Sequence, residues 1–104
     1  GPNGGVPVRN WEKLPQSERK LDYVSDMELA NALYLMVRDG HSVPMDDCFG
    51  AALDLIGFKR LTKATRERLE GICGKMLTQG WLRKNADRLQ LGETSDSFNV
   101  YLLR

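Results

Sequence analysis

Three stretches with a helical spacing of apolar residues, each followed by a glycine, constrain the fold of this chain more than any other feature. The first starts at Ser25-Asp26-Met27-Glu28, where a serine at the cap and a glutamate three residues later form a capping box. The residues that follow at i, i+4, i+7 and i+8 make one apolar helical face: Leu29, Leu33, Met36 and Val37. With Gly40 as a left-handed stop, we predict a helix over residues 26–39.

The same kinds of signal predict two more helices. Pro44 holds His41-Ser42-Val43 extended and then opens a second helix, with Asp46 and Asp47 near its positive end. The apolar stripe of this helix, which Gly57 ends, is Phe49, Ala52, Leu53 and Ile56. A third helix is predicted from Thr62 to Gln79, ended by Gly80, with the stripe Leu69, Ile72, Cys73 and Met76.

Two short strands follow the third helix. Residues 81–84 and 89–91 flank a polar stretch of turn composition, which predicts a β-hairpin. Residues 92–97 are expected to form a loop, and residues 99–104 one more strand. We expect this strand to pair with the hairpin, with pairing to another chain as the alternative. Helix, short strand, helix, helix and hairpin is the order of a winged helix, an α+β fold with a helix-turn-helix core and a hairpin wing.

The N-terminal part is expected to lie outside this core. Residues 1–5, Gly-Pro-Asn-Gly-Gly, are typical of a protease-cleavage remnant and linker, and we exclude them from the fold. Residues 6–24 are predicted to form an arm, and residues 25–104 the winged-helix domain. We expect Trp11, Leu14 and Tyr23 to hold the arm on the domain.

The composition fits one small globular domain, with 104 residues of which 41% are apolar. No apolar run approaches the roughly 18 residues that a membrane-spanning helix needs, and no leader is visible. Cys48 and Cys73 stand far apart and outside any CxxC motif. We therefore expect two buried thiols in a reducing, intracellular compartment, the cytoplasm in a prokaryote.

Four segments between Glu28 and Leu91 resemble a domain of unknown function near the C-terminus of large bacterial and archaeal helicase–nuclease proteins. They are Glu28-Leu29, the Gly40 turn, Leu55-Ile56-Gly57-Phe58-Lys59-Arg60-Leu61 and Leu77-Thr78-Gln79-Gly80-Trp81-Leu82, covering a span of about two-thirds of the chain. The Gly-Phe-Lys-Arg stretch is the most specific. The resemblance implies a winged-helix-like accessory module in a nucleic-acid-processing protein, and it supplies no catalytic residue.

Positive charge is concentrated in one block although the net charge is only +1. Residues 59–88 carry nine Lys and Arg against three Asp and Glu, whereas residues 1–58 carry five against nine. In helix-turn-helix proteins the third helix and its flanks contact DNA, and cations there release counterions from the duplex. The predicted nucleic-acid-binding residues are Lys59, Arg60, Lys63, Arg66, Lys75, Arg83, Lys84 and Arg88.

The outward face of the third helix has an unusual composition for a DNA reader. At about 100° per residue, it consists of Ala64, Glu67, Gly71, Gly74 and Thr78, with Lys63 and Lys75 at the edges. Base readers are usually Arg, Lys, Asn or Gln, so we expect phosphate contacts with low sequence specificity. Two glycines inside a helix indicate close approach by a DNA backbone, a partner helix or the chain's own arm. The alternative hypothesis is a protein-interaction module that docks or dimerises through this face.

Residue patterns typical of catalysis are missing from the sequence. His41 is the single histidine, at a helix-ending turn, with no spacing that indicates a triad or zinc site. Asp46 and Asp47 have a sufficient explanation in the helix dipole, and Gly71 and Gly74 lie within a helix and not in a phosphate-binding loop. We expect no enzyme activity, no cofactor, no metal and no small-molecule substrate.

Overall fold

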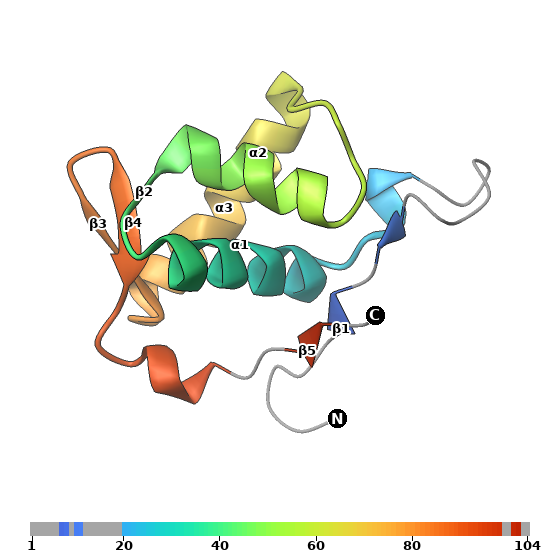
Figure 1. Cartoon of the computed structure of the whole chain (residues 1–104). Helices are drawn as coiled ribbons and strands as arrows, with labels where there is room; N and C mark the ends of the chain where they lie inside the picture. The colour runs from blue at the N-terminus through green and yellow to red at the C-terminus, as the bar shows by residue number, and fades with distance from the viewer. Residues whose placement is uncertain (1–6, 9, 12–19, 99–100, 103–104) are drawn as a thin grey trace.

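Three helices and a small antiparallel sheet form the body of the protein (Figure 1). The computed structural model describes residues 7–8, 10–11, 20–98 and 101–102. The helices are α1 (Asp26–Gly40), α2 (Met45–Leu55) and α3 (Lys63–Thr78). The sheet has the order β2-β4-β3, from β2 (Val43–Pro44), β3 (Leu82–Asn85) and β4 (Arg88–Leu91). This α+β arrangement is compatible with a winged-helix layout.

The start of α1 follows the predicted capping box, while its end differs from the prediction by one residue. The Glu28 backbone N–H donates to Ser25 Oγ at 3.1 Å. Gly40 is still helical, and His41 takes the positive φ of 66°. Gly40 is required for a different reason, because a Cβ at this position would collide with the Val43 side chain. The helix therefore ends where the chain turns tightly into β2.

The hairpin is present as predicted, with shifted strand ends: β3 omits Trp81, and Asn85 and Arg88, predicted in the turn, belong to β3 and β4. Ala86, with φ of 57°, and Asp87 make the turn. The register pairs Asn85 with Arg88 and Leu82 with Leu91. Since cross-strand partners share a face of the sheet, Leu82, Lys84, Leu89 and Leu91 lie on the face toward the helices, whereas Arg83, Asn85, Arg88 and Gln90 lie on the outer face.

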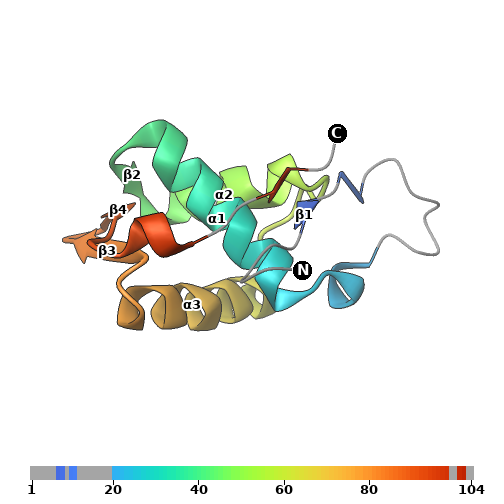
Figure 2. The same ribbon diagram turned by 90° about the horizontal axis from the view of Figure 1, so that it is seen from below.

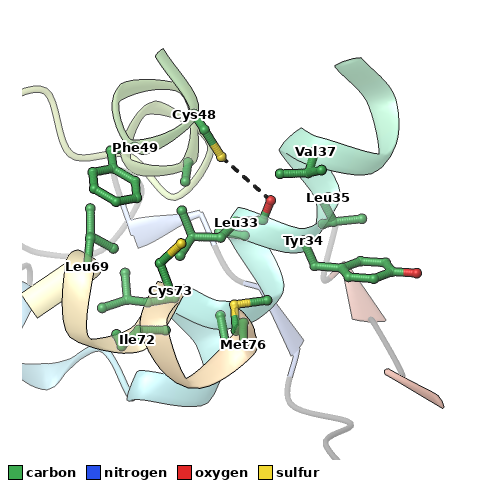
Figure 3. Close-up of a cluster of buried hydrophobic side chains, with 14 of the residues drawn as sticks. Leu33, Tyr34, Leu35, Val37, Cys48, Phe49, Leu69, Ile72, Cys73 and Met76 are labelled. Carbon is green, nitrogen blue, oxygen red and sulfur yellow. Dashed lines mark hydrogen bonds between the residues drawn. The ribbon is translucent and has the colours of Figure 1, made fainter. Parts of the chain in front are cut away.

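The core surrounds α1, which is buried along most of its length (Figure 3). Its large side chains come from all three helices and the hairpin, among them Leu29, Leu33, Phe49, Leu53, Ile56, Leu69, Met76, Leu82 and Leu89. Both cysteines belong to this core, as predicted, and Cys48 Sγ donates to the Leu33 carbonyl oxygen at 3.8 Å. Burial raises the pKa of Cys48 to about 12 and also raises the pKa of Cys73.

The last strand does not pair with the hairpin, so that prediction is wrong. β5 (Tyr101–Leu102) pairs in parallel with β1 (Pro7–Val8) on the far side of α1 from the hairpin (Figure 1). The chain is led away by the 3-10 turn Ser95–Ser97, whose Ser95 carbonyl oxygen accepts from the Tyr34 hydroxyl at 3.3 Å. Phe98 then packs between Tyr34 and Trp81, with ring centroids 4.9 Å from each. Residues 99–100 and 103–104 lie outside the described residues.

Trp11 holds the arm on the domain, as predicted. Its side chain is only 4% exposed, its indole N–H donates to a Glu28 carboxylate oxygen at 2.7 Å, and its backbone N–H donates to the Ile56 carbonyl oxygen at 2.7 Å. Tyr23 was expected to do the same, but it is 57% exposed, so that prediction is wrong. Leu14 and the predicted remnant of residues 1–5 lie outside the described residues.

The Trp11–Glu28 pair gives a stability prediction. Trp11→Phe keeps most of the buried ring but removes the donor to a carboxylate that is itself 1% exposed, and we expect a loss of about 1–3 kcal/mol of unfolding free energy. Trp11→Ala also empties the site and is expected to cost about 3–5 kcal/mol. Urea unfolding followed by circular dichroism measures both. The control Tyr23→Ala should change the free energy by less than about 0.5 kcal/mol, and an equal effect of Trp11→Phe and Tyr23→Ala would contradict the assigned role.

Candidate nucleic-acid interface

The predicted basic residues lie on α3, on the turn before it and on the hairpin. Figure 2 shows α3 along one side of the molecule, with the hairpin at one end and the 3-10 turn Leu21–Tyr23 near the other. Seven of the eight predicted binding residues are exposed: Lys59, Arg60, Lys63, Lys75, Arg83, Lys84 and Arg88. The eighth, Arg66, is half-buried.

Two of the eight cations are paired with carboxylates of the same chain. The Arg66 guanidinium binds the Asp46 carboxylate at the start of α2. Lys59 Nζ lies 3.9 Å from an oxygen of Asp54. Since both partners of the Lys59 pair are largely exposed, it holds the lysine only weakly. Because Asp46 binds its guanidinium, Arg66 is less available to an external anion than its position in the sequence indicates.

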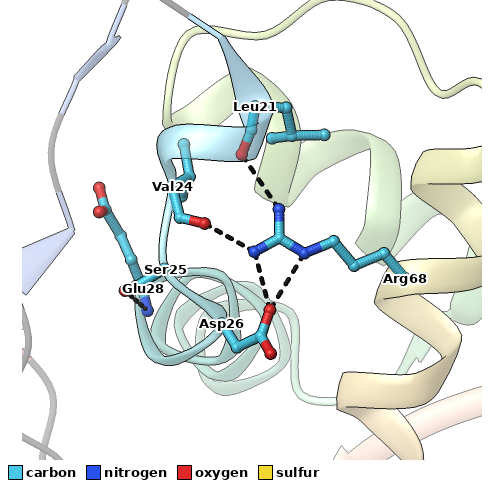
Figure 4. Close-up of polar contacts among 6 residues, drawn as sticks. All are labelled: Leu21, Val24, Ser25, Asp26, Glu28 and Arg68. Carbon is cyan, nitrogen blue, oxygen red and sulfur yellow. Dashed lines mark hydrogen bonds and ion pairs between the residues drawn. The ribbon is translucent and has the colours of Figure 1, made fainter.

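A ninth cation of the same block, Arg68, serves the fold (Figure 4). Its guanidinium donates to the Asp26 carboxylate at 2.7 and 3.0 Å, to the Leu21 carbonyl oxygen at 3.0 Å and to the Val24 carbonyl oxygen at 2.6 Å. A planar guanidinium fork suits such convergent acceptors. Arg68 thus fastens the segment that leads into α1 onto α3. Sequence reasoning missed this role, because its acceptors are more than 40 residues away in the chain.

The three cations of the hairpin lie on two different faces. Arg83 and Arg88 are on the outer face, where Arg83 Nε donates to Gln90 Oε1 at 2.9 Å and Arg88 Nη1 donates to the Ser42 carbonyl oxygen at 3.3 Å. Neutral acceptors leave the charge of both arginines uncompensated. Lys84 is on the opposite face and lines a groove of about 390 Å³ together with Asp46, Asp47 and Asp87. Acidic groups therefore surround Lys84 more than the two arginines.

A groove lies at the turn before α3. This groove of about 530 Å³ is lined by Leu21, Gly57, Phe58, Lys59, Arg60, Thr62 and Thr65. Thr62 caps α3, accepting from the Thr65 backbone N–H at 3.2 Å, and the first turn of α3 contains no acidic residue. Positive side chains and the positive helix end together favour a negatively charged group here, of the kind that a DNA phosphate supplies.

The outward face of α3 has the exposure that the helical period predicts. Ala64, Glu67, Gly71, Gly74 and Thr78 are all exposed. No described residue comes within 4 Å of a Cβ placed on Gly71 or Gly74. The described part of the arm therefore does not explain the two glycines, and a DNA backbone and a partner helix are the reasons taken up below.

The remaining chemically notable features of the described residues are the metal-ligand types, His41, the two cysteines and the apolar helices. The described residues hold no group of three or more His, Cys, Asp or Glu that could bind a metal ion, and His41 is exposed at the end of α1. The burial that raises the pKa of both cysteines keeps them as neutral thiols, which are poor nucleophiles. Among these residues, no helix has the length and apolar character needed to cross a bilayer.

No family model, curated protein or solved structure matches this chain. The resemblance of its Gly-Phe-Lys-Arg and neighbouring segments to a helicase-associated domain therefore stays a prediction.

The role of Arg68 gives the second prediction. Arg68→Leu keeps the aliphatic packing but loses hydrogen bonds to a carboxylate and two carbonyl oxygens, and we expect the unfolding free energy to fall by about 1–3 kcal/mol. Arg60→Leu is the control, since Arg60 is exposed and has no hydrogen bond or ion pair among the described residues. Urea unfolding of the two variants makes the comparison, and equal stabilities would overturn the assignment of Arg68 to the fold.

Proposed function

We propose that this domain is a non-catalytic, nucleic-acid-binding winged helix within a larger DNA-processing protein. It binds duplex DNA, mainly through phosphate contacts, and with low sequence specificity. The observation that carries the proposal is the set of exposed cations within residues 59–88 that have no carboxylate partner among the described residues. These are Arg60, Lys63, Lys75, Arg83, Lys84 and Arg88, all on α3, the turn before it or the hairpin.

The arrangement of these cations supports phosphate contact more than base reading. Arg60 and Lys63 lie at the start of α3, and Arg83 and Arg88 lie on the hairpin beyond its other end. Helix-turn-helix proteins use such flanking elements to grip the backbone while the third helix lies in the major groove. Between the two groups of cations, the exposed face of α3 carries mostly small side chains. Contacts of this kind hold a duplex without distinguishing most sequences.

The third prediction tests this surface. Arg60→Glu/Lys63→Glu should weaken binding of a labelled 20-base-pair random duplex at least tenfold and flatten the dependence of log Kd on log salt by about two. The unaltered domain, if all six cations contact phosphates, should lose about a thousandfold in affinity between roughly 50 and 200 mM salt. Fluorescence anisotropy measures both effects.

A matched control separates this surface from net charge. Arg38→Glu makes the same change in net charge as the single variant Lys63→Glu, at an exposed position on α1. We expect the affinity of Arg38→Glu to stay within about threefold of the unaltered domain, whereas Lys63→Glu should lose more. If Arg38→Glu and Lys63→Glu lose affinity equally, or if the unaltered domain binds no duplex at the lower salt, the proposed function is wrong.

One observation favours a second candidate function, docking or dimerisation through the outward face of α3. Gly71 and Gly74 are exposed, and no described residue comes near the position of a Cβ on either. A glycine inside a helix costs roughly 1 kcal/mol relative to alanine, and here the described residues give no reason for it. Close packing of a second helix against this face would explain both glycines, because a helix without side chains at these positions can be approached closely.

Gly71→Leu gives the fourth prediction. Because the space around Gly71 is open among the described residues, this variant should fold and gain up to about 1 kcal/mol in unfolding free energy. If α3 is a docking face, sedimentation equilibrium should show self-association of the unaltered domain and none of Gly71→Leu. Gly50→Leu is the control, an exposed helical glycine on α2 with equally open surroundings. A dimer that survives Gly71→Leu, or no dimer at all, rejects self-docking through this face.

A further inference from the structure

One acidic side chain stands at the centre of the outward face of α3. Glu67 is exposed and has no ion-pair partner among the described residues. Its neighbours at i−3, i+4 and i+7 are the small residues Ala64, Gly71 and Gly74, and longer side chains lie only on the side of Lys63 and Glu70. A lone carboxylate here works against phosphate binding, which is the function proposed above, unless it has a partner of its own.

Cations flank this carboxylate on both sides. By the helical period, Lys63 lies about 40° to one side of Glu67 and Lys75 about 80° to the other, and both are exposed. The other acid of α3, Glu70, lies about 60° away on the Lys63 side. The face therefore carries a carboxylate at its centre and a lysine to either side, with the second carboxylate, Glu70, beyond Lys63.

The major groove of B-DNA has the complementary distribution. A helix about 10–12 Å across fills a groove about 12 Å wide, so the centre of its face meets base edges while its edges meet phosphates. Among the base edges, the N4 amino group of cytosine is the donor that Glu and Asp accept from. Resting on the proposed function, we propose that Glu67 is a specificity-determining residue that selects cytosine at one position of the bound duplex.

The small residues around Glu67 serve this contact. With glycine at i+4 and i+7, the helix backbone can lie deep in the groove, and the glutamate side chain can reach a base edge past these two positions. A single good base contact corresponds to a preference of about fivefold or more. One such position leaves the overall specificity low, because every other contact goes to the phosphate backbone.

The test compares three repeating 20-base-pair duplexes by fluorescence anisotropy, built of G·C, I·C and A·T pairs. The I·C duplex lacks the guanine amino group and so resembles A·T in the minor groove, but it keeps the cytosine amino group in the major groove. The unaltered domain should bind the G·C and I·C duplexes about five- to tenfold more tightly than the A·T duplex. Glu67→Ala should bind all three equally, and Glu67→Gln should prefer A·T, because glutamine pairs with adenine N6 and N7.

Glu70→Gln is the matched control, with the same charge change on the same helix away from the centre of the face. It should raise the affinity for all three duplexes and leave their order unchanged. Equal affinity of the unaltered domain for the three duplexes, or a cytosine preference that survives Glu67→Ala, overturns the role of Glu67 while salt-sensitive binding leaves the proposed function standing. If none of the duplexes binds at about 50 mM salt, the proposed function fails and this inference fails with it.

Discussion

The burial of α1 is the constraint on which the rest of the structure depends. A helix that is apolar nearly all round must be covered on every side, and α1 is covered by α2, α3, β1 and β4. Its buried carboxylate, Glu28, accepts a hydrogen bond from the Trp11 indole, so that a segment of the arm covers this position as well. Because α3 gives one face to this core, its opposite face is left outward. The position of the candidate interface is thus a consequence of how α1 is buried.

Much of this architecture could be predicted from local patterns. The helices and the hairpin follow from apolar spacing, caps and turn residues, which act over a few positions along the chain. The pairing of β5 with β1 could not be predicted, because it depends on Phe98 packing against Tyr34 and Trp81, which are distant in sequence. The exposure of Tyr23 was missed for a similar reason. An aromatic residue next to a core helix is buried only if another element covers it, and the residue of the arm that is buried against α1 is Trp11 and not Tyr23.

The sequence predicted where the candidate site lies better than it predicted which of its cations are free to bind a partner. Residues 59–88 have a clear excess of Lys and Arg, but counting along the chain does not show which cations find partners within the fold. Arg68 binds Asp26 and two carbonyl oxygens, and Arg66 binds Asp46. Both pairings join α3 to the start of another helix, so part of the positive block stabilises the arrangement of the helices. The cations left for an external partner are fewer than the sequence indicates, and they lie toward the two ends of α3.

The outward face of α3 is where the two candidate functions meet. Gly71 and Gly74 lower helix stability by about 1 kcal/mol each, and no described residue packs on either. A DNA groove and a partner helix both require a backbone that can be approached closely, so the glycines alone do not separate the two functions. The proposed cytosine contact of Glu67 distinguishes them, because a carboxylate with a lysine to either side fits amino groups framed by phosphates. A partner helix would need a cation opposite Glu67 and acids opposite Lys63 and Lys75. DNA meets the equivalent requirement with its ordinary base edges and backbone, and for that reason we favour it as the partner of this face.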